Sequence, residues 1–224
     1  MDRYVRQIKL SEIGVEGQRK LRDSSVVVVG VGALGTLSAE ILVRMGIGKV
    51  CLVDGDRVSL VNLHRQVLFC EDDVDKLKVL VAKEKLGRLN SSVKVDVVDE
   101  FLNEDNVDVL LFGFDLILDC TDNMKARQVI NDFCFRFGKT WIYAAASSVR
   151  GNVAVIDDAE KFSSFFRTGE TFDSCSDVGV FSPVCSLVSS IQVSETVKFL
   201  LGKEYSKELL RFDLWKNSFD KIKL

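Results

Sequence analysis

The strongest constraint on the fold is a glycine-rich turn between a strand-like run and a helix-like run. Residues 24–30 are mostly valine, which is typical of a strand buried on both faces. The turn Gly30-Val31-Gly32-Ala33-Leu34-Gly35 follows at once, and residues 33–45 then show helical periodicity. A GxGxxG turn in this setting predicts a βαβ unit that holds a phosphate at the helix N-terminus.

Each glycine of this turn has an expected task. Gly30 permits the tight turn, Gly32 lets the backbone approach a phosphate, and Gly35 allows the helix to pack closely on the sheet. Asp54 ends the second predicted strand, where its carboxylate can accept hydrogen bonds from ribose hydroxyls. These features predict a nucleotide site, and the alternative is a glycine-rich turn that binds no ligand.

The rest of the chain alternates between strand-like and helix-like segments after an amphipathic N-terminal stretch, residues 4–21. Strands are expected at 49–54, 93–98, 115–120, 140–146 and 152–157. Helices are expected at 76–89, 103–112 (weaker), 125–137 and 184–201, with a closing hairpin near the C-terminus. This order predicts a Rossmann-like, doubly wound α/β fold: a mostly parallel sheet with antiparallel C-terminal strands.

Composition and charge narrow the function classes. The chain has 224 residues, a net charge of −3 and 47% hydrophobic residues, which excludes disordered classes and argues against nucleic-acid and membrane binding. No linker divides it, so residues 1–224 are expected to form a single domain with an N-terminal helical segment (1–22) and a crossover loop (158–182). Without a signal peptide, and with six cysteines in no CxxC pair, a cytoplasmic protein without zinc is expected.

The loop after Asp54 favours a polyphosphate over a nicotinamide nucleotide. It carries Asp56, Asn62 and Arg65, and Lys78 comes shortly after. Two cations and an amide suit phosphoryl or nucleotidyl transfer, whereas no pattern for a hydride-facing pocket is visible. Asp122 follows the next buried strand, where a carboxylate can hold a magnesium ion that bridges phosphates.

Several motifs together resemble the MoeB/ThiF/HesA family, the bacterial and archaeal relatives of ubiquitin-activating enzymes. The match covers nearly the whole chain in the family's order, and the motifs are specific jointly although none suffices alone. They are RYVRQI (3–8), GVGALG (30–35), DGDRVSLVNLHRQ (54–66), Lys78, DCTDN (119–123) and SCSDVGVFSP (174–183).

The resemblance implies an adenylating enzyme that uses ATP and Mg²⁺ on the C-terminal Gly-Gly tail of a small ubiquitin-like sulfur-carrier protein. It implies that Asp54 holds the ribose and that Asn62, Arg65 and Lys78 contact the phosphates. By the same resemblance Asp122 binds magnesium, with Asn123 beside it. Arg6 would enter the partner subunit's site, which makes a homodimer the expected unit, although pairing with Glu12 or Glu16 is the alternative.

Cys175 could have a role in the reaction, and the chain departs from the family pattern in two ways. Cys175 lies in a polar, glycine-containing stretch, and in some relatives the matching cysteine bonds to the carrier; an unreactive loop cysteine is the alternative. The zinc-binding CxxC pairs of many relatives are absent, and so is an appended sulfurtransferase domain, so the sulfur donor is expected to be a separate protein. Ala33 replaces a frequent glycine, and His64 is expected to be a surface or packing residue.

Other functions remain open at the level of sequence. A dehydratase-type member of the superfamily would activate a tRNA-borne or small-molecule carboxylate, but the acidic net charge disfavours a tRNA partner. An inactive scaffold, half of a heterodimer, conflicts with the retention of Arg65, Lys78 and Asp122. An NAD-dependent reductase is the fourth possibility, since a lone GxGxxG with an acidic residue most often indicates NAD or FAD.

Overall fold

An eight-stranded sheet forms the centre of the computed structural model, which describes residues 2–158, 160–163 and 178–224. The strand order is β3-β2-β1-β4-β5-β6-β7-β8. Strands β3, β2, β1, β4 and β5 are parallel, and β6, β7 and β8 continue the sheet in antiparallel pairing. The predicted mostly parallel sheet with antiparallel C-terminal strands is therefore confirmed.

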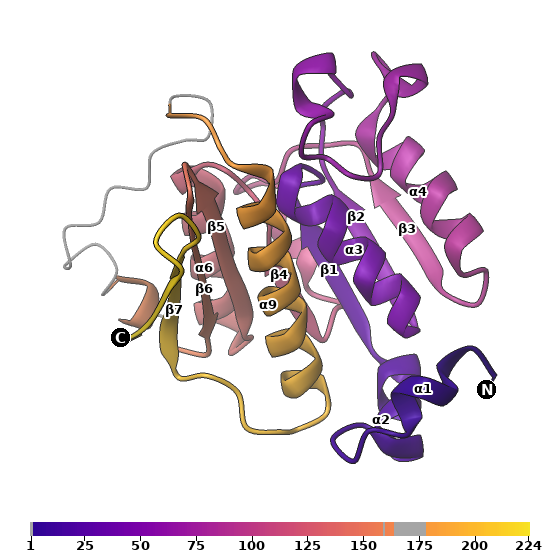
Figure 1. Ribbon diagram of the computed structural model, residues 1–224, viewed down its shortest axis with the longest axis vertical. Coiled ribbons are helices and arrows are strands. Elements are labelled where there is room, and N and C mark those ends of the chain that lie inside the picture. The colour runs from indigo at the N-terminus through magenta and orange to yellow at the C-terminus, as the bar shows by residue number, and fades with distance from the viewer. Residues whose placement is uncertain (1, 159, 164–177) are drawn as a thin grey trace.

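The strands and helices follow the predicted order along the chain (Figure 1). The strands are β1 (Ser25–Val29), β2 (Lys49–Val53), β3 (Lys94–Val98), β4 (Leu116–Asp119), β5 (Trp141–Ser147), β6 (Arg150–Ile156), β7 (Glu208–Asp213) and β8 (Ser218–Lys223). The α-helices are α1 (Val5–Ile8), α2 (Gly14–Asp23), α3 (Ala33–Met45), α4 (Lys78–Leu89), α5 (Val107–Leu111), α6 (Met124–Phe137) and α9 (Ser182–Leu200). Short 3₁₀ turns are η1 (Asp2–Tyr4), η2 (Leu60–Asn62) and η3 (Glu71–Asp73).

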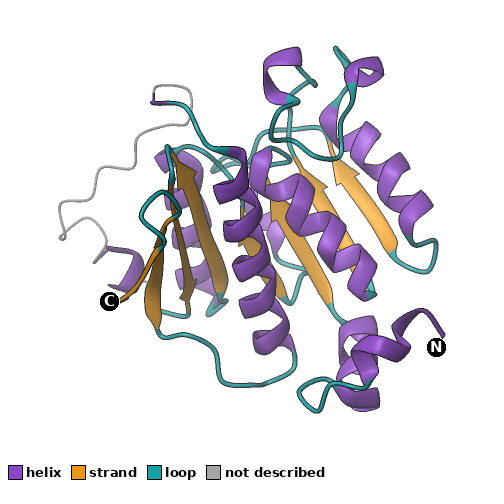
Figure 2. Cartoon of the chain, viewed as in Figure 1, coloured by secondary structure: helices purple, strands orange, loops and turns teal. Residues whose placement is uncertain are grey.

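Helices cover both faces of the sheet because successive strand side chains point to opposite faces. In β1, Val26 and Val28 pack in the core under α3, α4 and α9, whereas Val27 and Val29 pack in the core under α5 and α6. Figures 1 and 2 show α3 and α9 on the near face of the sheet and α6 behind it. Burial on both faces explains the uninterrupted apolar runs in the sequence.

The topological switch point lies between β1 and β4, which are neighbours in the sheet although two strands separate them in the sequence. From here the chain winds outward in both directions, so the loops after β1 and β4 diverge and leave a crevice at the carboxyl edge of the sheet. Ligands of doubly wound folds bind in this crevice.

Two segments differ from the predicted helices. The N-terminal stretch is broken into α1 and α2, and Gly14, with a positive φ of 61°, begins the second helix. The weaker helix predicted over 103–112 shortens to α5, because the Asn103 side chain accepts hydrogen bonds from the N–H groups of Asp105 and Asn106 and forms a turn instead. Most of the predicted crossover loop, including Cys175, lies outside the described residues.

Candidate nucleotide-binding site

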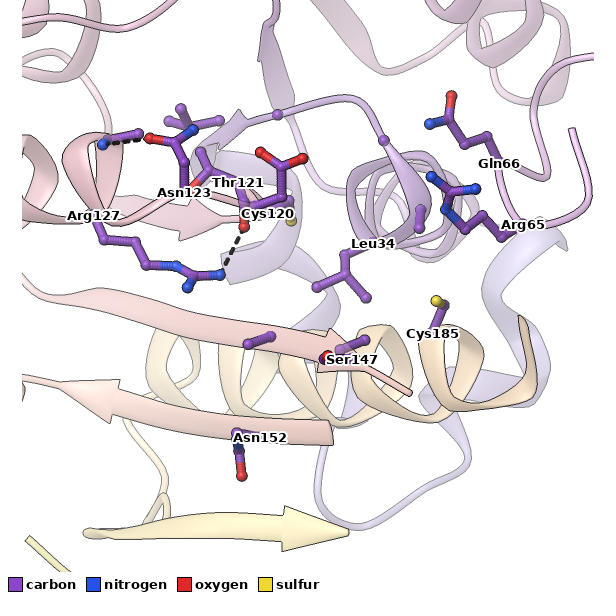
Figure 3. A pocket seen from close by; sticks show the side chains of 18 of the residues that line it. Leu34, Arg65, Gln66, Cys120, Thr121, Asn123, Arg127, Ser147, Asn152 and Cys185 are labelled. Atoms are coloured by element: carbon purple, nitrogen blue, oxygen red, sulfur yellow. Dashed lines mark hydrogen bonds between the residues drawn. The ribbon is translucent and has the colours of Figure 1, made fainter. Parts of the chain in front are cut away.

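A pocket of about 1250 Å³ opens at the carboxyl edge of the sheet, above the switch point. In Figure 3, Arg65 and Gln66 stand on one side of it and Thr121 and Asn123 on the other, with Leu34 between. Ten of the residues predicted for the site line this pocket together: Gly30, Gly32, Ala33, Asp54, Asp56, Asn62, Arg65, Lys78, Asp122 and Asn123.

The glycine loop forms the floor of the pocket, and its glycines differ in what surrounds them. Gly30 has a φ of 91°, and a Cβ there would lie 2.6 Å from the Cys120 carbonyl oxygen. A Cβ on Gly35 would overlap the Gly30 carbonyl oxygen. A Cβ on Gly32 would meet nothing nearer than the Gln66 side-chain nitrogen, at 3.7 Å. Gly30 and Gly35 therefore serve the fold, whereas Gly32 keeps space open for a ligand.

Asp54 binds the glycine loop directly. Its Oδ2 accepts a hydrogen bond from the Val31 N–H at 2.6 Å, and its Oδ1 accepts one from the Asp56 N–H at 2.8 Å. Burial raises the pKa of the Asp54 carboxyl, opposed by the nearby Lys78 ammonium and by these two N–H donors. The carboxylate joins the ends of β1 and β2, and each oxygen retains a lone pair for a further donor, such as a hydroxyl.

Lys78 reaches the site from the first turn of α4. Its side chain is 5% exposed, and its Nζ lies 2.8 Å from Oδ2 of the Asp56 carboxylate. The Lys78 N–H also donates to the Asp56 carbonyl oxygen. This double connection fixes a cation against the pocket although the two residues are far apart in sequence.

Arg65 lies on the loop after β2 and is held by that loop. Its Nη2 donates to Asn62 Oδ1 at 3.1 Å, and its Nη1 donates to the Val61 carbonyl oxygen at 3.3 Å and contacts His64 Nε2 at 2.7 Å. Asn62 thus binds the guanidinium with one side of its amide. The structure brings the predicted phosphate-binding residues together, with Arg65 and Lys78 lining one pocket.

Asp122 and Asn123 follow β4 on the opposite wall. Asp122 is exposed there and lines the pocket. Asn123 is the N-cap of α6: its Oδ1 accepts a hydrogen bond from the Ala126 N–H at 2.9 Å (Figure 3). Asn123 therefore stabilises the start of α6 and also lines the pocket.

A buried ion pair between Arg127 and Asp119 supports this wall of the pocket. Arg127 Nε lies 3.1 Å from Asp119 Oδ2, with side-chain exposures of 4% and 0%. Arg127 Nη2 donates to the Thr121 carbonyl oxygen at 2.8 Å (Figure 3), and Asp119 Oδ1 accepts from the Thr121 N–H and hydroxyl. The pair therefore fixes the backbone of Thr121, the residue directly before Asp122.

Gly35 and Arg6, two further residues predicted for function, are not among those that line the pocket. Gly35 packs behind the loop, as its predicted role requires. Arg6 is exposed on α1, which lies beside α2 near the amino end of β1 (Figure 1). Glu16 pairs instead with Arg19, and Arg6 forms no salt bridge within the described part of the chain. Cys175 lies outside the described residues.

The sequence analysis missed several pocket residues. Gln66 is 3% exposed and lines the pocket, and its Oε1 has no hydrogen-bond partner among the described residues. The sequence did contain a signal for Gln66, because it directly follows Arg65 in the motif DGDRVSLVNLHRQ (54–66). Arg150 at the start of β6 also lines the pocket and pairs with Asp213 at 3.2 Å. Nothing in the local sequence marks Arg150, because its place depends on how β6 joins the sheet.

Cys120 lines the pocket, but its thiol is not reactive. Burial raises the pKa of the Cys120 thiol, which therefore stays protonated and unreactive near neutral pH.

Within the described ranges, no group of three or more His, Cys, Asp or Glu side chains is placed so that it could hold a metal ion. None of the described helices is both long enough and apolar enough to span a membrane.

Comparison with solved structures supports the fold. A crystal structure of Escherichia coli MccB with ATP superimposes with a TM-score of 0.85 at 23% identity, covering all of this chain and 71% of that one. A structure of PaaA gives a TM-score of 0.81 over 99% of this chain. At such identities the likeness concerns the fold.

Comparison with curated proteins identifies the family. The chain is 36% identical over 234 residues to the sulfur carrier protein adenylyltransferase of Thermus thermophilus, covering 99% of this chain and 86% of that protein. It is 35% identical to the sulfur carrier protein ThiS adenylyltransferase of Escherichia coli, covering 94% and 86%. It is 38% identical to the adenylyltransferase and sulfurtransferase MOCS3 of Culex quinquefasciatus, but spans only 52% of its length. The ThiF family model matches residues 4–224, and the chain belongs to the ThiF family.

Proposed function

We propose that this protein is an ATP-dependent adenylyltransferase that activates the C-terminal glycine carboxylate of a small ubiquitin-like sulfur-carrier protein. The observation that carries the proposal is the placement of Arg65 and Lys78 in one pocket with the glycine loop and Asp122. Relatives of similar sequence bear names of sulfur carrier protein adenylyltransferases. Residues 1–224 would then act as one ATP-binding adenylation domain, for thiamine, molybdopterin or related sulfur transfer.

In the proposed reaction a carboxylate oxygen of the carrier attacks the α-phosphorus of ATP. The bond between the α-phosphorus and the oxygen bridging to the β-phosphate breaks, so an acyl-adenylate forms and pyrophosphate leaves. Two anions must approach each other, and Arg65 and Lys78 stabilise the negative charge that gathers on the phosphates. Asp54, at the end of β2, would hold the ribose hydroxyls, and Gly32 would leave room for a phosphate.

Magnesium fits this site on its donor chemistry. Mg²⁺ usually takes one or two protein carboxylates and completes its shell with phosphate oxygens and water. Asp122, an exposed carboxylate that lines the same pocket as Arg65, would supply such a ligand. When bound there, the ion would neutralise phosphate charge.

Partners and later steps extend the proposal. We infer a homodimer in which Arg6 completes the site of the partner subunit, because Arg6 does not line the pocket of its own chain. A separate sulfurtransferase would supply sulfur. Cys51, Cys70, Cys120 and Cys134 are free thiols, which suits a cytoplasmic protein. Cys175 would act only after adenylation, because forming an acyl-adenylate needs no nucleophilic thiol. The Cys175→Ala protein should therefore keep pyrophosphate exchange but lose any covalent carrier adduct on a non-reducing gel.

Calorimetry with ATP and NAD tests the nucleotide directly. With magnesium present, ATP should bind and NAD should not, since Arg65 and Lys78 line the pocket and suit a polyphosphate. Tight NAD binding without detectable ATP binding would refute the proposal and favour a reductase.

A further inference from the structure

His64, the one histidine of the chain, connects the loop after β2 to the start of α9. Its Nε2 lies 2.7 Å from Arg65 Nη1, and its Nδ1 lies 3.1 Å from Ser182 Oγ. The Ser182 hydroxyl donates in turn to the His64 carbonyl oxygen at 2.6 Å. The imidazole therefore has a different partner at each ring nitrogen.

The protons of these contacts can be assigned from donor chemistry. A guanidinium nitrogen only donates, so His64 Nε2 must offer a lone pair to Arg65. A neutral imidazole then carries its proton on Nδ1, which donates to Ser182 Oγ. The Ser182 proton is already directed to the His64 carbonyl oxygen, so every donor in the chain of contacts meets an acceptor. The geometry requires the neutral Nδ1–H tautomer.

This arrangement leaves one edge of Arg65 available. The two protons of Nη1 go to His64 and to the Val61 carbonyl oxygen, and one proton of Nη2 goes to Asn62. The Nε–H and the second Nη2 proton have no partner among the described residues. These two nitrogens are neighbours on the guanidinium plane and can bind two oxygens of one phosphate.

We propose that His64 is a positioning residue whose neutral Nδ1–H tautomer, anchored by Ser182, holds Arg65 ready for the phosphates of ATP. The role deepens the proposed function and rests on it. A proton on Nε2 would remove the lone pair that Arg65 requires and would set two cations against each other. The groups in contact with the ring are the Arg65 guanidinium from its own loop and, from α9, the Ser182 hydroxyl at the positive helix N-terminus.

Nitrogen NMR on histidine-labelled protein without ATP tests the geometry. The spectrum reports His64 alone, since no other histidine is present. Near pH 7.5 we expect Nδ1 to carry the proton, although free imidazole in water prefers the other tautomer. Ser182→Ala should shift the population toward Nε2–H. The matched control Ser190→Ala, on the same helix and bonded only within it, should not. A dominant Nε2–H tautomer in the unmutated protein, or no response to Ser182→Ala, would overturn the proposal.

Calorimetry with magnesium and ATP tests the consequence for binding. At pH 7.5, His64→Gln should keep most of the ATP affinity, because glutamine can still accept a hydrogen bond from Arg65. His64→Asn is too short to reach Arg65 and should bind ATP about fivefold more weakly than His64→Gln.

The outcomes separate the two proposals. Equal ATP affinity in His64→Asn and the unmutated protein, with ATP bound tightly by both, would overturn the role of His64 and leave the proposed function standing. Failure of the unmutated protein to bind ATP would overturn the proposed function, and the tautomer of His64 would then decide the geometric claim alone.

Discussion

Lys78 and Asp56 form an ion pair of 2.8 Å whose two members differ sharply in exposure, 5% for the lysine side chain and 54% for the aspartate side chain. The ammonium is therefore held inside the pocket while its counterion keeps contact with water. Such a cation is already in place before a polyanion arrives, which is the arrangement that electrostatic catalysis requires.

Replacing Lys78 by methionine should abolish carrier-dependent ATP–pyrophosphate exchange while the protein stays folded. Methionine keeps the apolar stem packed, and Asp56 can be solvated when its partner is lost. Loss of one preorganised cation costs about 3 kcal/mol, roughly a hundredfold in rate. Lys83→Met, at an exposed position of the same helix, is the matched control. Exchange within threefold of the unmutated protein would remove Lys78 from the site.

Alanine substitutions should separate the two tasks of the glycine loop. Gly32→Ala should leave the fold intact, because the added methyl meets only a side chain at 3.7 Å, but it should weaken ATP binding strongly. Gly35→Ala should destabilise the protein itself, because its methyl would overlap the Gly30 carbonyl oxygen. Thermal unfolding and ATP calorimetry on both variants check this. ATP affinity unchanged in Gly32→Ala would show that no phosphate approaches there.

Asp73 should make stability depend on acid pH. Burial alone would raise the pKa of its carboxyl, but hydrogen bonds from Lys85, from the Cys70 thiol and from the Cys70 N–H together lower it to about 2. An unfolded aspartate has a pKa of about 3.9, so the stabilisation is complete above that value and is lost as pH falls toward 2.

Urea unfolding of Asp73→Asn checks this dependence. The variant should lose about 1 kcal/mol of unfolding free energy at pH 7, and the loss should shrink as pH falls below about 4. Asp72→Asn, an exposed neighbour, should change neither value. A pH-independent loss in Asp73→Asn would place its effect in packing rather than in charge.

Mixing two inactive variants tests whether Arg6 acts in the partner's site. Arg6→Ala and Lys78→Met should each be inactive, while an equimolar mixture should recover about one quarter of the activity. Half of the dimers are then mixed, and one of their two sites lacks neither residue. A mixture that stays inactive while subunit exchange is demonstrated would contradict a role of Arg6 across the interface.

Much of the fold could be predicted because buried parallel strands leave an unmistakable apolar pattern. The valine run of β1 and the glycine turn identify the first βαβ unit from sequence alone, whereas the pairing of β1 with β4 is seen only in the structure. The N-terminal stretch was predicted to be helical, and its division into α1 and α2 was not predicted. The positive φ of Gly14 becomes visible only in the structure.

The site was predictable where residues follow strand ends and not where tertiary packing places them. Asp54 and Asp122 follow strands directly, so their convergence could be foreseen. Arg150 reaches the pocket from an antiparallel strand, and no local pattern announces its position. His64 was interpreted as a surface or packing residue, and the structure shows it exposed. Its contact with Ser182 joins positions 118 residues apart, which sequence periodicity cannot reveal.

ATP–pyrophosphate exchange with a purified ThiS-type sulfur carrier ending in Gly-Gly tests the central claim most directly. Exchange should require ATP, magnesium and the intact tail, and mass spectrometry should find the carrier joined to AMP. A carrier truncated by its last glycine should not support exchange. Tight ATP binding without exchange on any carrier, or exchange that ignores the loss of the tail, would contradict activation of a carrier's terminal carboxylate.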